Sequence, residues 1–202
     1  MNNETELKLL LAPQDHSRIL IAPCLAGYPR STLHLVNTYF DTPERVLNSA
    51  RVALRIREKN GRYIQTLKTK GESVCGLSHR GEWEWNLPSP ALDIERLSVV
   101  LPEVLSGVDL TTLQPVFRTD FKRQVIDIVW QGAEIELALD LGEVIAGERT
   151  LPISELELEL KSGDESSLYS LADALRQDVK LTSGDISKAE QGYRLAQGDY
   201  VT

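Results

Sequence analysis

Apolar and polar side chains alternate with a period of two residues along several stretches of the chain. Near the N-terminus, Glu4, Glu6 and Lys8 alternate with Leu7 and Leu9. Alternate side chains of a β-strand point to the same face, so this stretch predicts a strand with one charged and one apolar face. Similar patterns predict further strands over residues 33–40, 50–58, 63–68, 79–87, 117–130, 134–141, 143–146 and 153–160.

Turn signals and helical periodicity separate these strands. Asn60-Gly61 stands between two of them and is a strong hairpin signal, because the favoured two-residue turn needs positive φ at both positions. The predicted helices cover residues 13–22, 92–105, 165–177 and, after Ser187, the end of segment 183–195. We find no repeat and no linker, so a single domain over residues 1–202 is the simplest organisation.

The polar faces of these strands carry charges of both signs. A charged face on one strand is typical of a sheet that faces water. Many such strands, with amphipathic helices to cover their apolar faces, favour a sheet closed into a barrel with an ionic lumen. Both signs are needed there, because an unpaired buried charge is costly. The charged rows are Arg51, Arg55 and Arg57; Arg80, Glu82 and Glu84; Glu134, Glu136 and Asp140; and Glu155, Glu157, Glu159 and Lys161.

Composition narrows the possible functions. The formal net charge of −8 gives no indication of general nucleic-acid binding, so any anion site must be a local basic cavity. The two cysteines, Cys24 and Cys75, form no CxxC or Cys/His cluster and suit a reducing compartment. There is neither a signal-peptide profile nor an apolar run of about 20 residues, so we expect a cytoplasmic protein without membrane contact.

An ionic lumen suggests a definite chemistry. Mg²⁺ takes oxygen ligands from a few carboxylates and completes its shell with phosphate oxygens. Guanidinium groups bind phosphate in bidentate fashion. A tunnel that joins an acidic to a basic cluster therefore predicts a site for a metal ion and a polyphosphate.

A set of ordered motifs resembles one known family. The motifs are Glu4-x-Glu6-x-Lys8, Leu54-Arg55-Ile56-Arg57, Thr66-Leu67-Lys68, Arg80-x-Glu82-x-Glu84, Asp120-Phe121 with basic flanks, Glu155-x-Glu157-x-Glu159 and Ser187-Lys188. Together they resemble the CYTH superfamily of triphosphate tunnel metalloenzymes, and most of all its bacterial inorganic triphosphatase branch. The resemblance implies an α+β fold, with an eight-stranded antiparallel β-barrel (tunnel) and helices on its outside. It also implies hydrolysis of inorganic triphosphate with Mg²⁺ or Mn²⁺.

The resemblance also implies roles for individual residues. Lys188 would point into the tunnel and position or activate the attacking water, acting with Arg57 and Glu6 in catalysis. Arg118 and Arg123 have opposite strand parity: they are an odd number of residues apart, so a regular strand points them to opposite faces. Both face inward only if a bulge intervenes. Lys70 shares the parity of Lys68 and is expected near the rim. The expected metal ligands are Glu4, Glu6, Glu157 and Glu159, with Glu82, Glu84 or Asp140 nearby. The expected phosphate ligands are Lys8, Arg55, Arg57, Lys68, Arg80, Arg118 and Arg123.

Three other functions stay open on the sequence. A class IV-type adenylate cyclase would convert ATP to cyclic AMP and pyrophosphate in the same cage. A thiamine triphosphatase would need a platform for thiamine, and a polyphosphate-binding module would lack turnover. The expected partner is inorganic triphosphate or a nucleoside triphosphate, bound by a monomer or homodimer. Relatives in the bacterial branch often carry a further C-terminal helical domain, so the chain is expected to be a stand-alone version or one domain of a longer protein.

Overall fold

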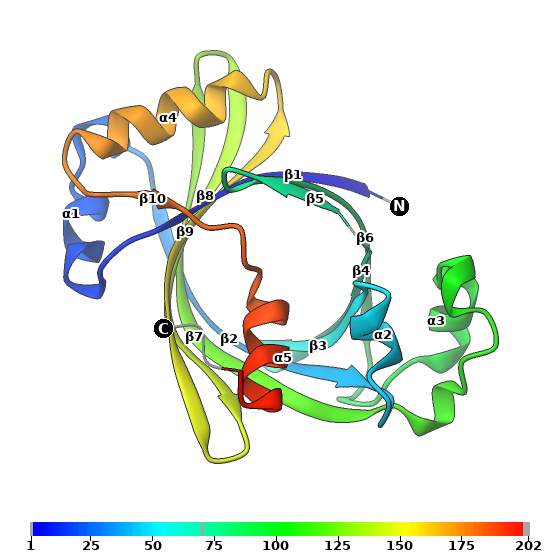
Figure 1. Ribbon diagram of the computed structural model, residues 1–202. Helices are drawn as coiled ribbons and strands as arrows, with labels where there is room; N and C mark the ends of the chain where they lie inside the picture. The colour runs from blue at the N-terminus through cyan, green and yellow to red at the C-terminus, as the bar shows by residue number, and fades with distance from the viewer. Residues whose placement is uncertain (1, 70, 200–202) are drawn as a thin grey trace.

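The strands of the protein form one antiparallel sheet that closes on itself (Figure 1). The computed structural model describes residues 2–69 and 71–199, so the prediction for Lys70 lies outside the described residues. The barrel strands are β1 (Asn2–Leu10), β2 (Arg30–Asp41), β3 (Ala53–Lys59), β4 (Arg62–Lys68), β6 (Leu77–Leu87), β7 (Gln114–Trp130), β8 (Ala133–Ala146) and β9 (Arg149–Ser162).

These eight strands close in the order β1-β9-β8-β7-β2-β3-β4-β6, and β6 pairs with β1 to complete the ring. Two short strands, β5 (Glu72–Val74) and β10 (Thr182–Ser183), extend the sheet beside β6 and β1. The α+β fold with an eight-stranded antiparallel barrel is therefore confirmed. Asn60 and Gly61 have φ values of 52° and 72° between β3 and β4, as the predicted hairpin turn requires.

Helices cover two parts of the outer surface of the barrel (Figure 1). On one side, α1 (His16–Leu20) and α4 (Ser166–Arg176) pack over β1, β8 and β9. Leu137, Leu156 and Leu158 are fully buried there, and each contributes about 1.5–3 kcal/mol by leaving water. On the other side, α2 (Val46–Ser49) and α3 (Ile94–Val100) cover β3, β4 and β6. Trp83 and Trp85 pack into this second cluster, as their shared apolar face predicts.

The last helix, α5 (Lys188–Gln197), packs against inward-facing side chains of the barrel. Tyr193 joins a cluster with Phe117 and Phe121, which share strand parity with Arg123 on β7. Gly192 permits this approach, since a Cβ there would lie 2.0 Å from Phe117 Cε2. In Figure 1, α5 accordingly lies within the outline of the ring, whereas α1, α3 and α4 lie outside it.

Some predicted boundaries differ from the structure. The helix predicted over 92–105 ends at Val100, because Pro102 cannot continue it, and a 3-10 turn follows at Glu103–Leu105. The strands predicted over 134–141 and 143–146 are one strand, β8. Gly142 keeps it continuous, because a Cβ at this position would lie 2.2 Å from the Asp120 carbonyl oxygen. Arg51 has a φ of 56° and precedes β3, so it does not continue the row of Arg55 and Arg57.

Candidate active site

The interior of the barrel holds a charged cavity of about 1070 Å³. This volume lies just above the usual range for small-molecule sites, about 300–1,000 Å³, and leaves room for a linear triphosphate together with metal ions. The predicted site residues that line it are Glu4, Glu6, Lys8, Arg55, Arg57, Lys68, Arg80, Glu82, Glu84, Arg123, Glu157, Glu159 and Lys188.

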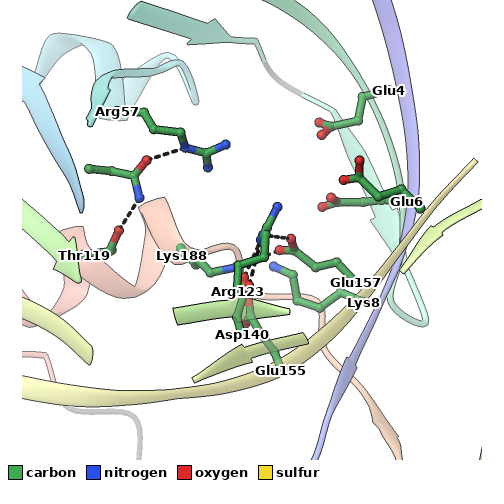
Figure 2. Close-up of polar contacts among 12 residues, drawn as sticks. Glu4, Glu6, Lys8, Arg57, Thr119, Arg123, Asp140, Glu155, Glu157 and Lys188 are labelled. Carbon is green, nitrogen blue, oxygen red and sulfur yellow. Dashed lines mark hydrogen bonds and ion pairs between the residues drawn. The ribbon is translucent and has the colours of Figure 1, made fainter. Parts of the chain in front are cut away.

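One wall of the cavity is acidic and lies on β1 and β9. Glu6 stands opposite Glu159 in the strand register. Glu4 is the next inward-facing residue of β1, and Figure 2 shows it beside Glu6. Arg80 bridges Glu4 and Glu6 at 2.9 and 2.6 Å, while Lys68 Nζ lies 2.7 Å from Glu4. Clustered carboxylate oxygens are the ligands that Mg²⁺ and Mn²⁺ prefer, so this wall fits a divalent ion.

The carboxyl groups of the acidic wall differ in pKa. Burial alone would raise the pKa of Glu4, but Lys68 and Arg80 outweigh it and lower that pKa to about 2. Burial raises the pKa of Glu159, and Lys161, whose Nζ lies 2.7 Å from it, only partly offsets this effect. Glu136 lines the same wall and stands 3.8 Å from Lys161. The sequence placed Glu136 in a charged row but assigned it no role.

Lys188 anchors a second, more deeply buried cluster. It begins α5, and the Ser187 side chain caps that helix by accepting a hydrogen bond from the Glu190 backbone N–H. A lysine in the first turn is unfavourable beside the helix dipole, and three carboxylates compensate for it. Lys188 Nζ contacts Asp140 and Glu157 at 2.7 and 2.8 Å, and it also contacts Glu155.

This cluster determines the protonation of Lys188. Burial would lower its pKa, but Asp140, Glu155 and Glu157 raise it well above the ordinary lysine value. These ion pairs therefore favour the charged ammonium form of Lys188. Lys188 faces the tunnel, as predicted, and its part in positioning or activating the attacking water stays a prediction.

Asp140, one of the predicted metal ligands, is closely paired with cations in this structure. Its side chain is fully buried, and Arg123 binds both of its carboxylate oxygens at 2.7 Å. Oxygen atoms of Asp140, Glu155 and Glu157 lie within 4.8 Å of one another, but Lys188 already stands among them. Asp140 does not line the cavity, because Arg123 and Lys188 cover it, so it acts as an ion-pair partner for these two cations.

The opposite wall of the cavity is basic and lies on β3. Arg55 is buried, and its nearest carboxylates, on Glu82 and Glu84, are 3.9 Å away. For Arg57, the described residues provide no carboxylate within 4 Å. Burial and the charges of Arg55 and Arg123 lower the pKa of Arg57 to about 9. This wall therefore carries positive charge that the protein itself does not neutralise closely.

Two neutral residues that the sequence analysis missed hold Arg57. Its Nε donates to Asn37 Oδ1 at 2.8 Å, and Asn37 Nδ2 donates to Thr119 Oγ1 at 2.8 Å (Figure 2). A signal was present in the sequence, because Asn37 is an amide in the otherwise apolar or aromatic inward row of Leu33, Leu35 and Tyr39.

Arg118 was predicted to bind phosphate inside the tunnel, and this prediction is wrong because Arg118 is exposed on the outside of the barrel. β7 pairs with β8 without a shift from Arg118 to Trp130, so Arg118 and Arg123 face opposite sides. The pairing of β2 with β7 does shift its register nearby, between Tyr39, which pairs with Phe117, and Phe40, which pairs with Pro115. This irregularity lies before Arg118 in β7. The bulge that could have turned both arginines inward is therefore absent from this part of the described structure.

The fold and the site together define a class: closed β-barrel proteins with a charged tunnel, acidic on one wall and basic on the other. The CYTH domain family model matches residues 2–193, and the chain belongs to this family.

A sequence relative is the inorganic triphosphatase of Haemophilus influenzae (strain ATCC 51907 / DSM 11121 / KW20 / Rd), which is 36% identical over 208 residues. The match covers 100% of this chain and 57% of the relative, so the chain spans little more than half of that protein's length.

Two solved structures resemble the barrel over nearly its whole length. A Hippeastrum protein, named as an adenylyl cyclase with a dominant triphosphatase activity, has a TM-score of 0.72 at 23% identity, covering 98% of this chain and 97% of that one. The PH1819 protein of Pyrococcus horikoshii has a TM-score of 0.59 at 21% identity, covering 93% and 97%. At such identities the likeness concerns the fold. Among the described residues, no helix has the length and apolar character needed to cross a membrane.

Proposed function

We propose that the protein hydrolyses inorganic triphosphate (tripolyphosphate) to pyrophosphate and phosphate with the help of Mg²⁺ or Mn²⁺. The observation that carries this proposal is that an acidic wall and a basic wall face each other across the cavity. Glu4, Glu6 and Glu159 offer oxygen ligands on one side, and Arg55 and Arg57 offer closely unneutralised guanidiniums on the other. The inorganic triphosphatase named among the relatives supports the same reaction.

The residues of the chain divide the work of phosphoryl transfer, which depends mainly on positioning and charge stabilisation. Glu4, Glu6 and Glu159 would hold the ion, with Glu157 and Glu82 also lining the cavity. A bound ion supplies Lewis-acid polarisation of phosphate oxygens and a more acidic water.

The basic residues would hold the anion. Arg55 and Arg57 bind phosphate oxygens and stabilise the charge that develops. Lys188 stays protonated and adds a fixed positive charge from the α5 side of the cavity. The remaining predicted phosphate ligands that line the cavity are Lys8, Lys68, Arg80 and Arg123.

The direct test is phosphate release from tripolyphosphate and from ATP, each with Mg²⁺ and with Mn²⁺. We expect fast release from tripolyphosphate and slow release from ATP. Cyclic AMP and pyrophosphate formed from ATP would instead identify a cyclase. Tight tripolyphosphate binding without turnover under either metal would identify a binding module, and both outcomes would overturn the proposal.

Glu6→Gln tests the acidic wall. The amide keeps the shape of the side chain but removes an anionic ligand, so turnover should fall by at least about 100-fold. Steady-state phosphate release measures this, and circular dichroism checks the fold. The matched control is Glu148→Gln, the same exchange at an exposed turn between β8 and β9. Turnover close to that of the control would show that Glu6 is not a metal ligand.

A further inference from the structure

Thr119, Asn37 and Arg57 form one row across three neighbouring strands. Asn37 on β2 stands directly opposite Arg57 on β3 and directly opposite Thr119 on β7. Side chains opposite each other in adjacent strands have Cβ atoms about 5 Å apart, so the row can connect by hydrogen bonds. Asn37 and Thr119 are both fully buried, so their polar groups depend on partners inside the protein.

The hydrogen bonds of this row have a fixed direction. A guanidinium Nε can only donate, so the oxygen of the Asn37 amide must face Arg57 and its nitrogen must face Thr119. Arg57 Nε donates to Asn37 Oδ1 at 2.8 Å, and Asn37 Nδ2 donates to Thr119 Oγ1 at 2.8 Å. The Thr119 hydroxyl thus holds the amide, and the amide holds the guanidinium.

The bond to Asn37 leaves the terminal nitrogens of Arg57 available. Guanidinium groups carry five N–H donors, and this contact uses only the one on Nε. In Figure 2, the end of Arg57 points toward the side of the cavity that carries Glu4 and Glu6. The two terminal nitrogens form a fork of the kind that binds phosphate oxygens in bidentate fashion.

The partner of Arg57 differs from those of four other lumen cations. Carboxylates hold Lys68, Arg80, Arg123 and Lys188 at 2.8 Å or closer. Arg57 is oriented instead by a neutral amide, and the described residues place no carboxylate within 4 Å of it. An aspartate at position 37 would orient the guanidinium equally well but would cancel its charge. The amide gives orientation without neutralisation.

We propose that Asn37 and Thr119 are positioning residues that hold Arg57 as an oriented, unneutralised cation for a phosphate group of the substrate. This inference rests on the proposed function, because it specifies how the basic wall receives a triphosphate. Asn37 and Thr119 act through Arg57 and not by contact with the reacting atoms.

The first test measures tripolyphosphate binding by calorimetry in excess EDTA at fixed ionic strength. Asn37→Asp keeps the acceptor for Arg57 Nε and adds a negative charge beside it. This charge should weaken the charge-assisted hydrogen bonds between Arg57 and the phosphate. Losing such a bond weakens binding by roughly 10- to 100-fold, and we expect a loss of this size. The matched control is Gln124→Glu, an amide-to-acid exchange on the outer face of β7, with the same change of net charge.

A second test separates a positioning role from a general effect on the lumen. Asn37→Leu is neutral and similar in shape, and it removes the acceptor of Arg57. It should weaken binding in the native background but have no further effect when Arg57→Gln is already present. Thr119→Val should behave in the same way, and it keeps the test usable if the Asn37 variants fail to fold. Thermal unfolding of each variant identifies such failures.

Three results would overturn the inference. The first is that Asn37→Asp binds tripolyphosphate as tightly as Gln124→Glu does. The second is that Asn37→Leu or Thr119→Val weakens binding as much in the Arg57→Gln background as in the native one. The third is that the unmodified protein does not bind tripolyphosphate in EDTA. The proposed function fails separately, through absence of turnover with Mg²⁺ and Mn²⁺. A protein that binds tripolyphosphate through this row without hydrolysing it would retain the inference and lose the reaction.

Discussion

Glu4 combines burial with two close cationic partners. Its side chain is only 8% exposed, which disfavours a charged carboxylate, yet Lys68 and Arg80 hold its pKa near 2. The group is thus stabilised as an anion by the same cations that surround the cavity. Its folded-state pKa lies below the ordinary value of 4.5, so Glu4 stabilises the protein above about pH 4.5, and this contribution is lost as pH falls toward 2.

Glu4→Gln should remove this pH-dependent contribution. We expect the variant to be less stable than the native protein by about 3 kcal/mol at neutral pH, which is the pKa difference converted at 1.36 kcal/mol per unit. The gap should close between about pH 4.5 and 2. Urea unfolding of both proteins across this range, in EDTA, measures it. A gap that stays constant with pH would show that Glu4 has an ordinary pKa.

Residue parity explains which site residues the sequence could identify. Glu4, Glu6 and Lys8 alternate without interruption, so their shared face followed from the period of the strand. Arg118 and Arg123 share a strand but not a parity, and only the observed register decides which of them faces the cavity. Asp140 has the right parity but is covered by Arg123 and Lys188, a fact that depends on α5 and not on the strand pattern.

At the scale of elements, the strands were more predictable than the placement of the last helix. Alternation and the Asn60-Gly61 turn predicted the β3–β4 hairpin, which the structure contains. The sequence indicated that α5 is helical, but its packing against Phe117 and Phe121 joins distant parts of the chain. Lys188 reaches the carboxylates of β8 and β9 only because α5 lies on the inward-facing side of these strands.

Gly192→Ala tests how closely α5 must approach the barrel. Alanine favours an isolated helix by up to about 1 kcal/mol over glycine. The added Cβ would lie 2.0 Å from Phe117, whose ring stacks on Tyr39 at 4.5 Å, so we expect a net loss of about 1–3 kcal/mol. Chemical denaturation measures the change. Increased stability would show that Phe117 can move aside and that close packing of α5 is not required.

At the scale of the whole molecule, closure of the barrel brings opposite charges together. The chain has a net charge of −8, yet the lumen contains cations from β1, β3, β4, β6, β7 and α5. Most of the lumen carboxylates pair with these cations directly, which offsets the cost of removing them from water. Ion pairs inside the barrel therefore offset much of the cost of burying the acidic wall, while Arg55 and Arg57 keep no close carboxylate partner among the described residues.

Metal removal should separate activity from folding. Because the acidic wall already has cationic partners, we expect the protein in EDTA to keep its circular dichroism spectrum and a cooperative thermal transition, while triphosphate turnover is lost. Added Mg²⁺ or Mn²⁺ should restore turnover. The metal ion and tripolyphosphate added together should raise the melting temperature, because ligands that bind the native state stabilise it. Unfolding in EDTA would instead identify a structural metal.

The sequence by itself determined the strands, their charged faces, the barrel class and most of the charged residues around the cavity. These properties follow from a period of two and from the need to balance buried charge, both of which are local or compositional. The tertiary structure decided the orientation of Arg118, the covering of Asp140 and the row from Thr119 through Asn37 to Arg57. Each depends on strand register or on packing between distant segments, because a side chain's partners are set by the neighbours that folding brings to it.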